Sequence, residues 1–334
     1  MSGFTAPLAA QEEALVELNV ASTFSSAMPI LGNTTGQLAE NVAKMSNGTL
    51  ILVAHEPNGL VPASETVVAV SDGRVDAAWA GAGWFSGRDS AFNMFSSVPF
   101  GPDMGEYLAW MYHGGGLELS RELFAEHGVH NLPCGMIPPE ASGWFSKEIN
   151  TVEDLEGLRM RFFGLGARIM QQFGVETSQN APGDILAEIQ NGNLDATEFS
   201  LPAMDQRLGF QNELKYYYFP GWHQQATLFD LYFSIDTWES LSSSHQTILT
   251  TACGDQIRSM IAEGEAKQWE AMQQMQAEGV ELRRWPAATL VAFEDAWLEI
   301  VAEERAQNPN FERVWESYSS FRENYEIWKH FSFL

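Results

Sequence analysis

Arg161 is the residue whose type and position most strongly indicate ligand binding. It lies in a segment where apolar residues alternate with cationic or aromatic ones: Leu158, Arg159, Met160, Arg161, Phe162 and Phe163. A period of two is typical of a β-strand with two different faces. An arginine can bind a carboxylate through two parallel hydrogen bonds and keeps its charge at every ordinary pH. We therefore expect Arg161 to bind an anion, although an ordinary surface salt bridge would also explain it.

The net negative charge of the whole chain strengthens the case that Arg161 binds an anion. The 334 residues include 44 Asp and Glu but only 18 Lys and Arg, a formal net charge of −26. So few cations, spread over 334 residues, cannot easily form the basic face that nucleic acids and anionic lipid surfaces require. An anionic small molecule would also be repelled unless a local cation received it.

Length and composition indicate a folded protein of about two domains. At roughly 150 residues per domain, the chain is long enough for two hydrophobic cores. Its 11 Trp, 21 Phe and 8 Tyr exceed what a disordered chain contains. No apolar run approaches the ~18 residues of a membrane-spanning helix.

Several motifs of known chemistry occur only in incomplete form. Residues 113–116 (HGGG) resemble an esterase oxyanion loop, but the chain has no G-x-S-x-G elbow. Residues 81–87 (GAGWFSG) approach a dinucleotide-binding pattern whose third glycine comes one residue late, so we interpret them as a tight turn. His127 and His130 have no third ligand at metal spacing.

Two further features bear on the cellular location. Cys134 and Cys253 have no C-x-x-C spacing, and whether they form a disulfide cannot be decided from spacing. Residues 6–11 (APLAAQ) resemble the end of a signal peptide. We therefore interpret residues 1–16 as a residual signal or tag segment and expect an exported protein.

Patterns along the chain predict an α/β fold. Residues 17–22 and 50–54 are predicted strands, and residues 28–45 a helix between them, an order typical of parallel sheets. Residues 242–277 and 297–306 predict two more helices. Residues 65–79 and 184–199 share a pattern of helix, glycine and apolar-Asp-Ala strand. Either this succession is simply common in α/β proteins, or each copy belongs to one of two similar lobes.

The last segment, residues 311–334, predicts an amphipathic helix with an aromatic stripe. Its apolar residues recur at spacings of three and four: Phe311, Val314, Trp315, Tyr318, Phe321, Tyr325 and Trp328. The stripe could pack on its own domain. Because it is large and terminal, we expect it to pack on a second copy of the chain.

Several of these segments together resemble the substrate-binding proteins of TRAP transporters, the DctP-like family. Residues 157–161 (GLRMR), 192–198 (GNLDATE), 59–60 and 72–77 (DGRVDA) carry the resemblance, which covers about residues 17–334. Residues 98–101, 113–119, 143–149 and 216–223 are similar to members that bind 2-oxo or 2-hydroxy monocarboxylates together with a metal cation.

The resemblance implies a two-lobed periplasmic-binding-protein fold of the type II kind, with a long inter-lobe helix. Lobe 1 would comprise residues 17–137 and about 225–260, and lobe 2 residues 138–224 and about 261–310. Residues 311–334 would form a dimerisation helix. The ligand would lie in the cleft between the lobes, which would close around it.

The resemblance also implies a cation site. Its oxygen ligands correspond to Glu140, Glu198, the Phe199 carbonyl and Gln224, while Arg161 corresponds to the arginine that pairs with the ligand carboxylate. The related members more often have Gln, Trp and Glu at 140, 199 and 224. Two carboxylates nevertheless remain here, and an all-oxygen set favours calcium or sodium.

Further ligand contacts are implied for Glu140, Trp84, Phe100, Trp222 and His223. Trp84 stands near a position where Tyr is common, which leaves the exact ligand open. The implied function is a periplasmic receptor, not an enzyme, that delivers a small organic acid to TRAP membrane subunits and forms a homodimer. An aromatic acid, a sugar acid or a zwitterion is an alternative ligand, and a metal-dependent lyase or hydrolase is the alternative from another class.

Overall fold

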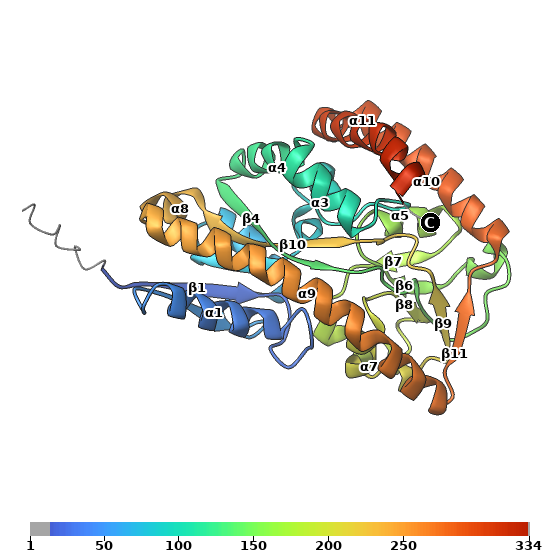
Figure 1. Ribbon diagram of the computed structural model, residues 1–334. Helices are drawn as coiled ribbons and strands as arrows, with labels where there is room; N and C mark the ends of the chain where they lie inside the picture. Colours follow the sequence, from blue (N-terminus) through green and yellow to red (C-terminus); the bar gives the residue numbers. More distant parts are fainter. Residues whose placement is uncertain (1–13, 333–334) are drawn as a thin grey trace, which may run out of the picture.

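Two β-sheets organise the computed structural model, which describes residues 14–332 (Figure 1). The first sheet has the strand order β2-β1-β3-β10-β4, and the second has the order β11-β9-β5-β8-β6-β7. We call the parts built on the first and second sheets lobe 1 and lobe 2. The predicted α/β architecture with two lobes is confirmed.

The elements have the following bounds. The strands are β1 (Val16–Ser22), β2 (Leu50–His55), β3 (Ala77–Ala80), β4 (Val129–Ile137), β5 (Gly143–Phe145), β6 (Arg159–Arg161), β7 (Glu176–Ser178), β8 (Ala196–Thr197), β9 (Tyr216–Phe219), β10 (Thr227–Ser234) and β11 (Glu281–Arg284). The α-helices are α1 (Asn33–Met45), α2 (Thr66–Ser71), α3 (Met104–His113), α4 (Gly116–Ala125), α5 (Leu165–Gln172), α6 (Ile185–Gln190), α7 (Pro202–Leu208), α8 (Ile235–Ser240), α9 (Ser243–Ala277), α10 (Ala287–Gln307) and α11 (Pro309–Ser332). None of these helices in the described residues is both long and apolar enough to cross a membrane.

The two segments with the same sequence pattern occupy equivalent places. The first supplies α2 and β3, and β3 lies between β1 and β10 inside the first sheet. The second supplies α6 and β8, and β8 lies between β5 and β6 inside the second sheet. The interpretation of two similar lobes is therefore the one that the structure supports.

Two chain segments, residues 138–142 and 220–226, cross between the lobes side by side. The Glu140 amide donates to the Gln224 carbonyl at 3.1 Å, and the Ser142 amide donates to the Tyr218 carbonyl at 2.8 Å. Behind them, α9 packs on α1 and β4 in lobe 1 and on α7 in lobe 2, along the length of the molecule (Figure 1). Gly264 of α9 allows this approach, because a Cβ there would lie 2.5 Å from Cδ of Pro138.

The helix predictions differ from the structure mainly at N-termini. Helix α1 begins at Asn33 rather than at residue 28, because residues 25–32 form turns. Helix α10 begins at Ala287, directly after Pro286 and ten residues before its predicted start. Helix α9 agrees with its prediction to within one residue.

The aromatic stripe of α11 packs mostly on its own chain. Phe311, Val314 and Tyr318 are buried, and Trp315 and Phe321 pack partly buried against the same hydrophobic core. The helix lies over α3 and α4 of lobe 1 (Figure 1). The expectation that the whole stripe packs on a second copy is wrong for this first half, because lobe 1 already covers it.

Cys134 of β4 and Cys253 of α9 form a disulfide bond. The two residues are 119 positions apart, and both are fully buried. The bond therefore attaches the long inter-lobe helix to the first sheet, close to where β4 leads into the crossing segment.

Removal of this disulfide should destabilise the chain substantially. We expect the Cys134→Ala/Cys253→Ala variant to lose about 2–5 kcal/mol of unfolding free energy, because the bond closes a long loop in the unfolded chain. Urea unfolding of the wild type with and without reductant, beside the variant, measures this. Equal stability of all three would contradict the expectation.

Candidate functional site

A small cavity lies between the lobes, where the crossing segments meet the ends of both sheets. Its lining is aromatic and aliphatic on one part and polar on another. The lining residues are Phe24, Leu31, Trp84, Glu140, Arg161, Phe163, Phe199, Ser200, Gln224, Thr227 and Phe229. Arg161 is the only Lys or Arg among them, so the cavity offers an anion a single permanent cation.

Arg161 and Glu198 form a buried ion pair on lobe 2. Their side chains are 2% and 0% exposed, and Nη1 of Arg161 lies 2.8 Å from Oε2 of Glu198. The same Nη1 donates to the Glu198 carbonyl oxygen at 2.6 Å, and the Glu198 amide donates to the Arg161 carbonyl at 2.9 Å. Strands β6 and β8 pair in parallel, so their ends bring the two residues together.

A second buried carboxylate, Glu140, lies on the first crossing segment and accepts a hydrogen bond from Ser200 Oγ at 3.1 Å. Burial raises its pKa well above the usual value, and the negative charges of Glu198 and Asp205 raise it further. One terminal amide atom of Gln224 lies 3.2 Å from both Glu140 oxygens and 2.7 Å from Thr227 Oγ1. If this atom is nitrogen it donates to Glu140; if it is oxygen, three oxygens converge, an arrangement suited to a cation.

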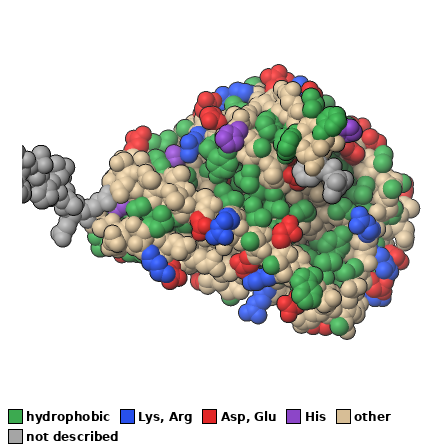
Figure 2. Space-filling view, viewed as in Figure 1, with side chains coloured by type: hydrophobic (Ala, Val, Ile, Leu, Met, Phe, Trp, Pro, Cys, Tyr) green, Lys and Arg blue, Asp and Glu red, His purple; other side chains and the backbone are tan. Residues whose placement is uncertain are grey.

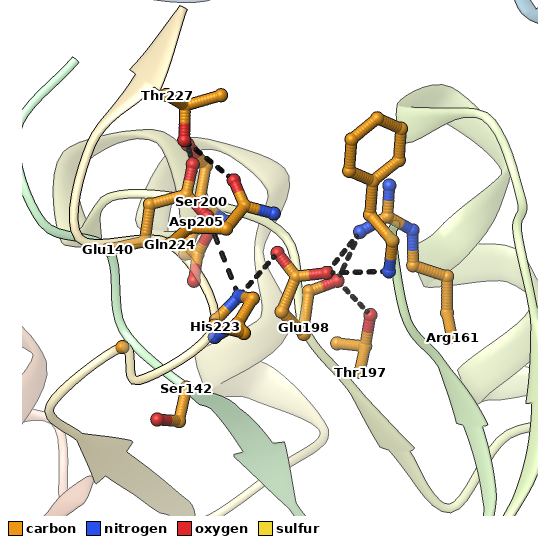
Figure 3. Close-up of polar contacts among 12 residues, drawn as sticks. Glu140, Ser142, Arg161, Thr197, Glu198, Ser200, Asp205, His223, Gln224 and Thr227 are labelled. Atoms are coloured by element: carbon orange, nitrogen blue, oxygen red, sulfur yellow. Dashed lines mark hydrogen bonds and ion pairs between the residues drawn. The ribbon is translucent and has the colours of Figure 1, made fainter. Parts of the chain in front are cut away.

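His223 lies between the two carboxylates (Figure 3). Its Nε2 is 3.4 Å from Oε1 of Glu198 and 3.8 Å from Oε2 of Glu140. Within the described residues, neither ring nitrogen of His223 nor Oε1 of Glu198 has a hydrogen-bond partner. Buried polar atoms are normally satisfied, so these unpaired atoms indicate that a further group belongs here.

These residues fit a bound cation. Glu140, Glu198 and His223 each offer a ligand atom, and these atoms lie within 4.8 Å of one another in the described part of the chain. Carboxylate and amide oxygens are the ligands that calcium and sodium prefer, and His223 adds a nitrogen that the sequence did not assign to the cation. When bound, the cation would supply positive charge beside the two carboxylates.

Asp205 of α7 supports the polar wall from behind. It accepts hydrogen bonds from Trp144 Nε1 at 2.9 Å, Tyr217 Oη at 2.8 Å and the Ser200 amide at 3.1 Å. Burial raises the pKa of Asp205 to about 7 despite these donors. Since Ser200 in turn donates to Glu140, Asp205 fixes the position of a candidate cation ligand without reaching the cavity itself.

The structure brings most of the predicted site residues together. Trp84, Glu140, Arg161, Phe199 and Gln224 line the cavity, and Glu198 and His223 contact these residues.

Phe100 and Trp222 do not line the cavity. Their rings stack with centroids 5.7 Å apart, and the Phe100 amide donates to the Trp222 carbonyl. Trp222 contacts His223 and Phe162 instead, so it packs against the site from outside.

Sequence reasoning missed six lining residues. Four are apolar residues of lobe 1 or lobe 2 and two carry hydroxyls: Phe24, Leu31, Phe163, Phe229, Ser200 and Thr227. In the sequence, Phe163 stands out only as part of the alternating pattern around Arg161. The other five lie in segments whose composition is typical of a hydrophobic core, so no local sequence pattern identifies them as cavity residues.

Comparison with known protein families identifies the family of this chain. The model of the bacterial extracellular solute-binding proteins of family 7, the DctP family, matches residues 21–308. The chain belongs to this family. The family consists of solute-binding proteins of transporters, so the interpretation as a receptor rather than an enzyme is confirmed.

Individual relatives carry more specific descriptions. The monocarboxylate 2-oxoacid-binding periplasmic protein of Nostoc sp. is 31% identical over 291 residues, which cover 87% of this chain and 80% of that protein. A TRAP solute-binding protein of Bordetella bronchiseptica, solved as a dimer with calcium and picolinate in one site, is 28% identical; the match covers 96% of this chain and 95% of that chain with a TM-score of 0.93. A Pseudoalteromonas atlantica protein with bound sodium and pyruvate is also 28% identical, covering 95% and 97% with a TM-score of 0.91.

The buried ion pair of this DctP-family protein gives a stability prediction. Replacing Arg161 by Ala should lower the unfolding free energy by about 3–5 kcal/mol, because it leaves the Glu198 carboxylate buried without its cation. Arg159→Ala is the matched control: Arg159 is in the same strand, but its pair with Asp195 is partly exposed and should contribute far less. Urea unfolding of both variants without ligand measures the difference; equal losses would contradict it.

Proposed function

We propose that this chain is the periplasmic receptor of a TRAP transporter for a 2-oxo or 2-hydroxy monocarboxylate and that a calcium or sodium ion binds with the ligand. One observation carries the proposal: Arg161 and Glu140 come from separate segments to line one inter-lobe cavity, and the Glu198 carboxylate pairs with Arg161 beside it. Two buried carboxylates beside an anionic ligand would be costly unless further positive charge accompanied them.

In the proposed complex, Arg161 binds the ligand carboxylate. Glu140, Glu198, Gln224 and the Phe199 carbonyl hold the cation, and His223 lies beside them. The names of the relatives support this combination, since they bind 2-oxoacids, pyruvate with sodium, or picolinate with calcium. The lobes close around the ligand and the receptor delivers it to the membrane subunits.

The lining of the cavity favours one carboxylate and an apolar remainder. A second carboxylate would face the rings of Phe24, Phe199 or Phe229, since Arg161 is the only Lys or Arg of the lining. The two lining hydroxyls are already engaged, Ser200 with Glu140 and Thr227 with Gln224. Sugar acids would therefore find few free hydrogen-bond partners.

Calorimetry with a panel of acids tests the proposed function. Pyruvate, 4-methyl-2-oxopentanoate and picolinate should bind the calcium- or sodium-loaded protein without turnover, whereas 2-oxoglutarate should bind at least about tenfold more weakly, because its second charge would be buried unpaired. Chelation in sodium-free buffer should weaken binding by a similar factor.

A charge-exchange variant serves as the matched control for the cation. Glu140→Gln alone removes a carboxylate and should weaken binding, while Glu140→Gln/Gln224→Glu returns the charge to the neighbouring position and should restore it. Full affinity without either ion, and in Glu140→Gln, would mean that no metal takes part. Binding of none of the monocarboxylates would refute the proposed ligand class.

We also propose a homodimer formed through the end of α11. Ile327, Trp328 and Phe331 are 68%, 61% and 82% exposed, unlike the first half of the stripe. Figure 2 shows hydrophobic side chains on the surface where this helix ends. The Bordetella relative is described as a dimer, which supports the assignment.

Light scattering should give twice the chain mass of 37.1 kDa. Trp328→Glu should yield monomers, because it places a charge in the proposed apolar contact. Trp269→Glu is the control, since Trp269 on α9 is 62% exposed and lies outside α11. A monomeric wild type, or equal dissociation by both substitutions, would argue against this interface.

A further inference from the structure

Phe163 belongs to lobe 2 but packs against lobe 1. It follows β6 by two residues, and its ring centroid lies 5.3 Å from that of Trp84, in the 3-10 helix Ala82–Phe85 of lobe 1. The Phe163 side chain is only 8% exposed. A buried residue of one lobe therefore packs against the other.

The ring of Phe163 occupies space that only a glycine at position 83 leaves free. A Cβ on Gly83 would lie 2.6 and 2.7 Å from Cζ and Cε1 of this ring, closer than real Cβ atoms approach. Gly83 is not among the glycines with positive φ, so its backbone conformation does not require glycine. Asn93 of lobe 1 lines the other side, with Oδ1 3.4 Å from the same Cβ position and 3.6 Å from that of Gly164.

The backbone of Phe163 reaches the binding site. Its amide donates to Oε2 of Glu198 at 3.1 Å, and this oxygen is the one that pairs with Arg161. The Arg161 Cζ is also 5.9 Å from the Phe163 ring centroid. One residue thus contacts the central ion pair through its backbone and the opposite lobe through its ring.

We infer that Phe163 is a positioning residue that couples occupancy of the site to closure of the lobes. Groups that fix Glu198 also fix the Phe163 backbone, and hence the ring that docks against Gly83, Trp84 and Asn93. This contact exists only when the lobes are together, so it slows ligand release. The inference rests on the proposed function for the identity of the ligand but not for the contact itself.

The substitution Gly83→Ala tests the contact selectively. With the lobes together, as in this structure, the added methyl group overlaps Phe163, and separation of the lobes would remove the overlap. Stopped-flow fluorescence with 4-methyl-2-oxopentanoate and calcium should show a dissociation rate raised about tenfold and an association rate within about twofold of wild type.

Two further variants separate this coupling from a general packing effect. Gly87→Ala is the control, because Gly87 has no atom within 4 Å of its Cβ position. In a Phe163→Leu background, Gly83→Ala should change the dissociation rate less than about twofold, because the clashing ring is gone. Equal rates for Gly83→Ala and Gly87→Ala, or an undiminished effect in the Phe163→Leu background, would overturn the inference.

The experiments distinguish failure of the proposed function from failure of this inference. If the wild type binds none of the monocarboxylates, the ligand class is wrong, but the contact can still be measured. Spin labels at the exposed positions 44 in lobe 1 and 190 in lobe 2 report the inter-lobe distance without ligand. Gly83→Ala should then deplete the short-distance population relative to Gly87→Ala, and identical distributions would overturn the inference.

Discussion

The buried ion pair between Arg161 and Glu198 is the interaction on which the binding site depends. In a chain with a net charge of −26, a fully buried carboxylate is retained because a guanidinium lies 2.8 Å away. The pair in turn holds the ends of β6 and β8, since each residue also hydrogen-bonds the backbone of the other. The position of Arg161 in the cavity lining is thus fixed by the sheet that carries it.

Three other residues near the candidate cation site lie on the segments that connect the lobes. Glu140 is on the first crossing segment, and His223 and Gln224 are on the second, where the backbones of Glu140 and Gln224 are hydrogen-bonded. A group bound by these residues and by Glu198 would connect the crossing segments to lobe 2. Binding and the relative position of the lobes therefore share the same atoms, which is the physical basis of hinge closure in such a receptor.

More carboxyl groups gather at this site than the cavity lining alone shows. Glu140 and Asp205 are fully buried with raised pKa values, and Glu198 lies close to both. The buried Asp205 carboxyl accepts hydrogen bonds from Trp144, Tyr217 and the Ser200 amide. Glu140 accepts one from the Ser200 hydroxyl. This difference explains why Glu140, rather than Asp205, is the carboxylate suited to a cation.

The sequence by itself determined the long helix α9, most of α11, the α/β class and the position of Arg161 in a strand. Apolar periodicity and short motifs are local properties of the chain, so they can be recognised without knowledge of the fold. They show which face of a helix is apolar but not what covers it, and the first half of α11 proved to be covered by lobe 1. Only the tertiary structure joined Cys134 to Cys253, exposed the role of Asp205 and placed Phe163 against Gly83. Most of these contacts join segments that are distant in sequence or in different lobes, and burial and packing across such distances leave no pattern in the local sequence.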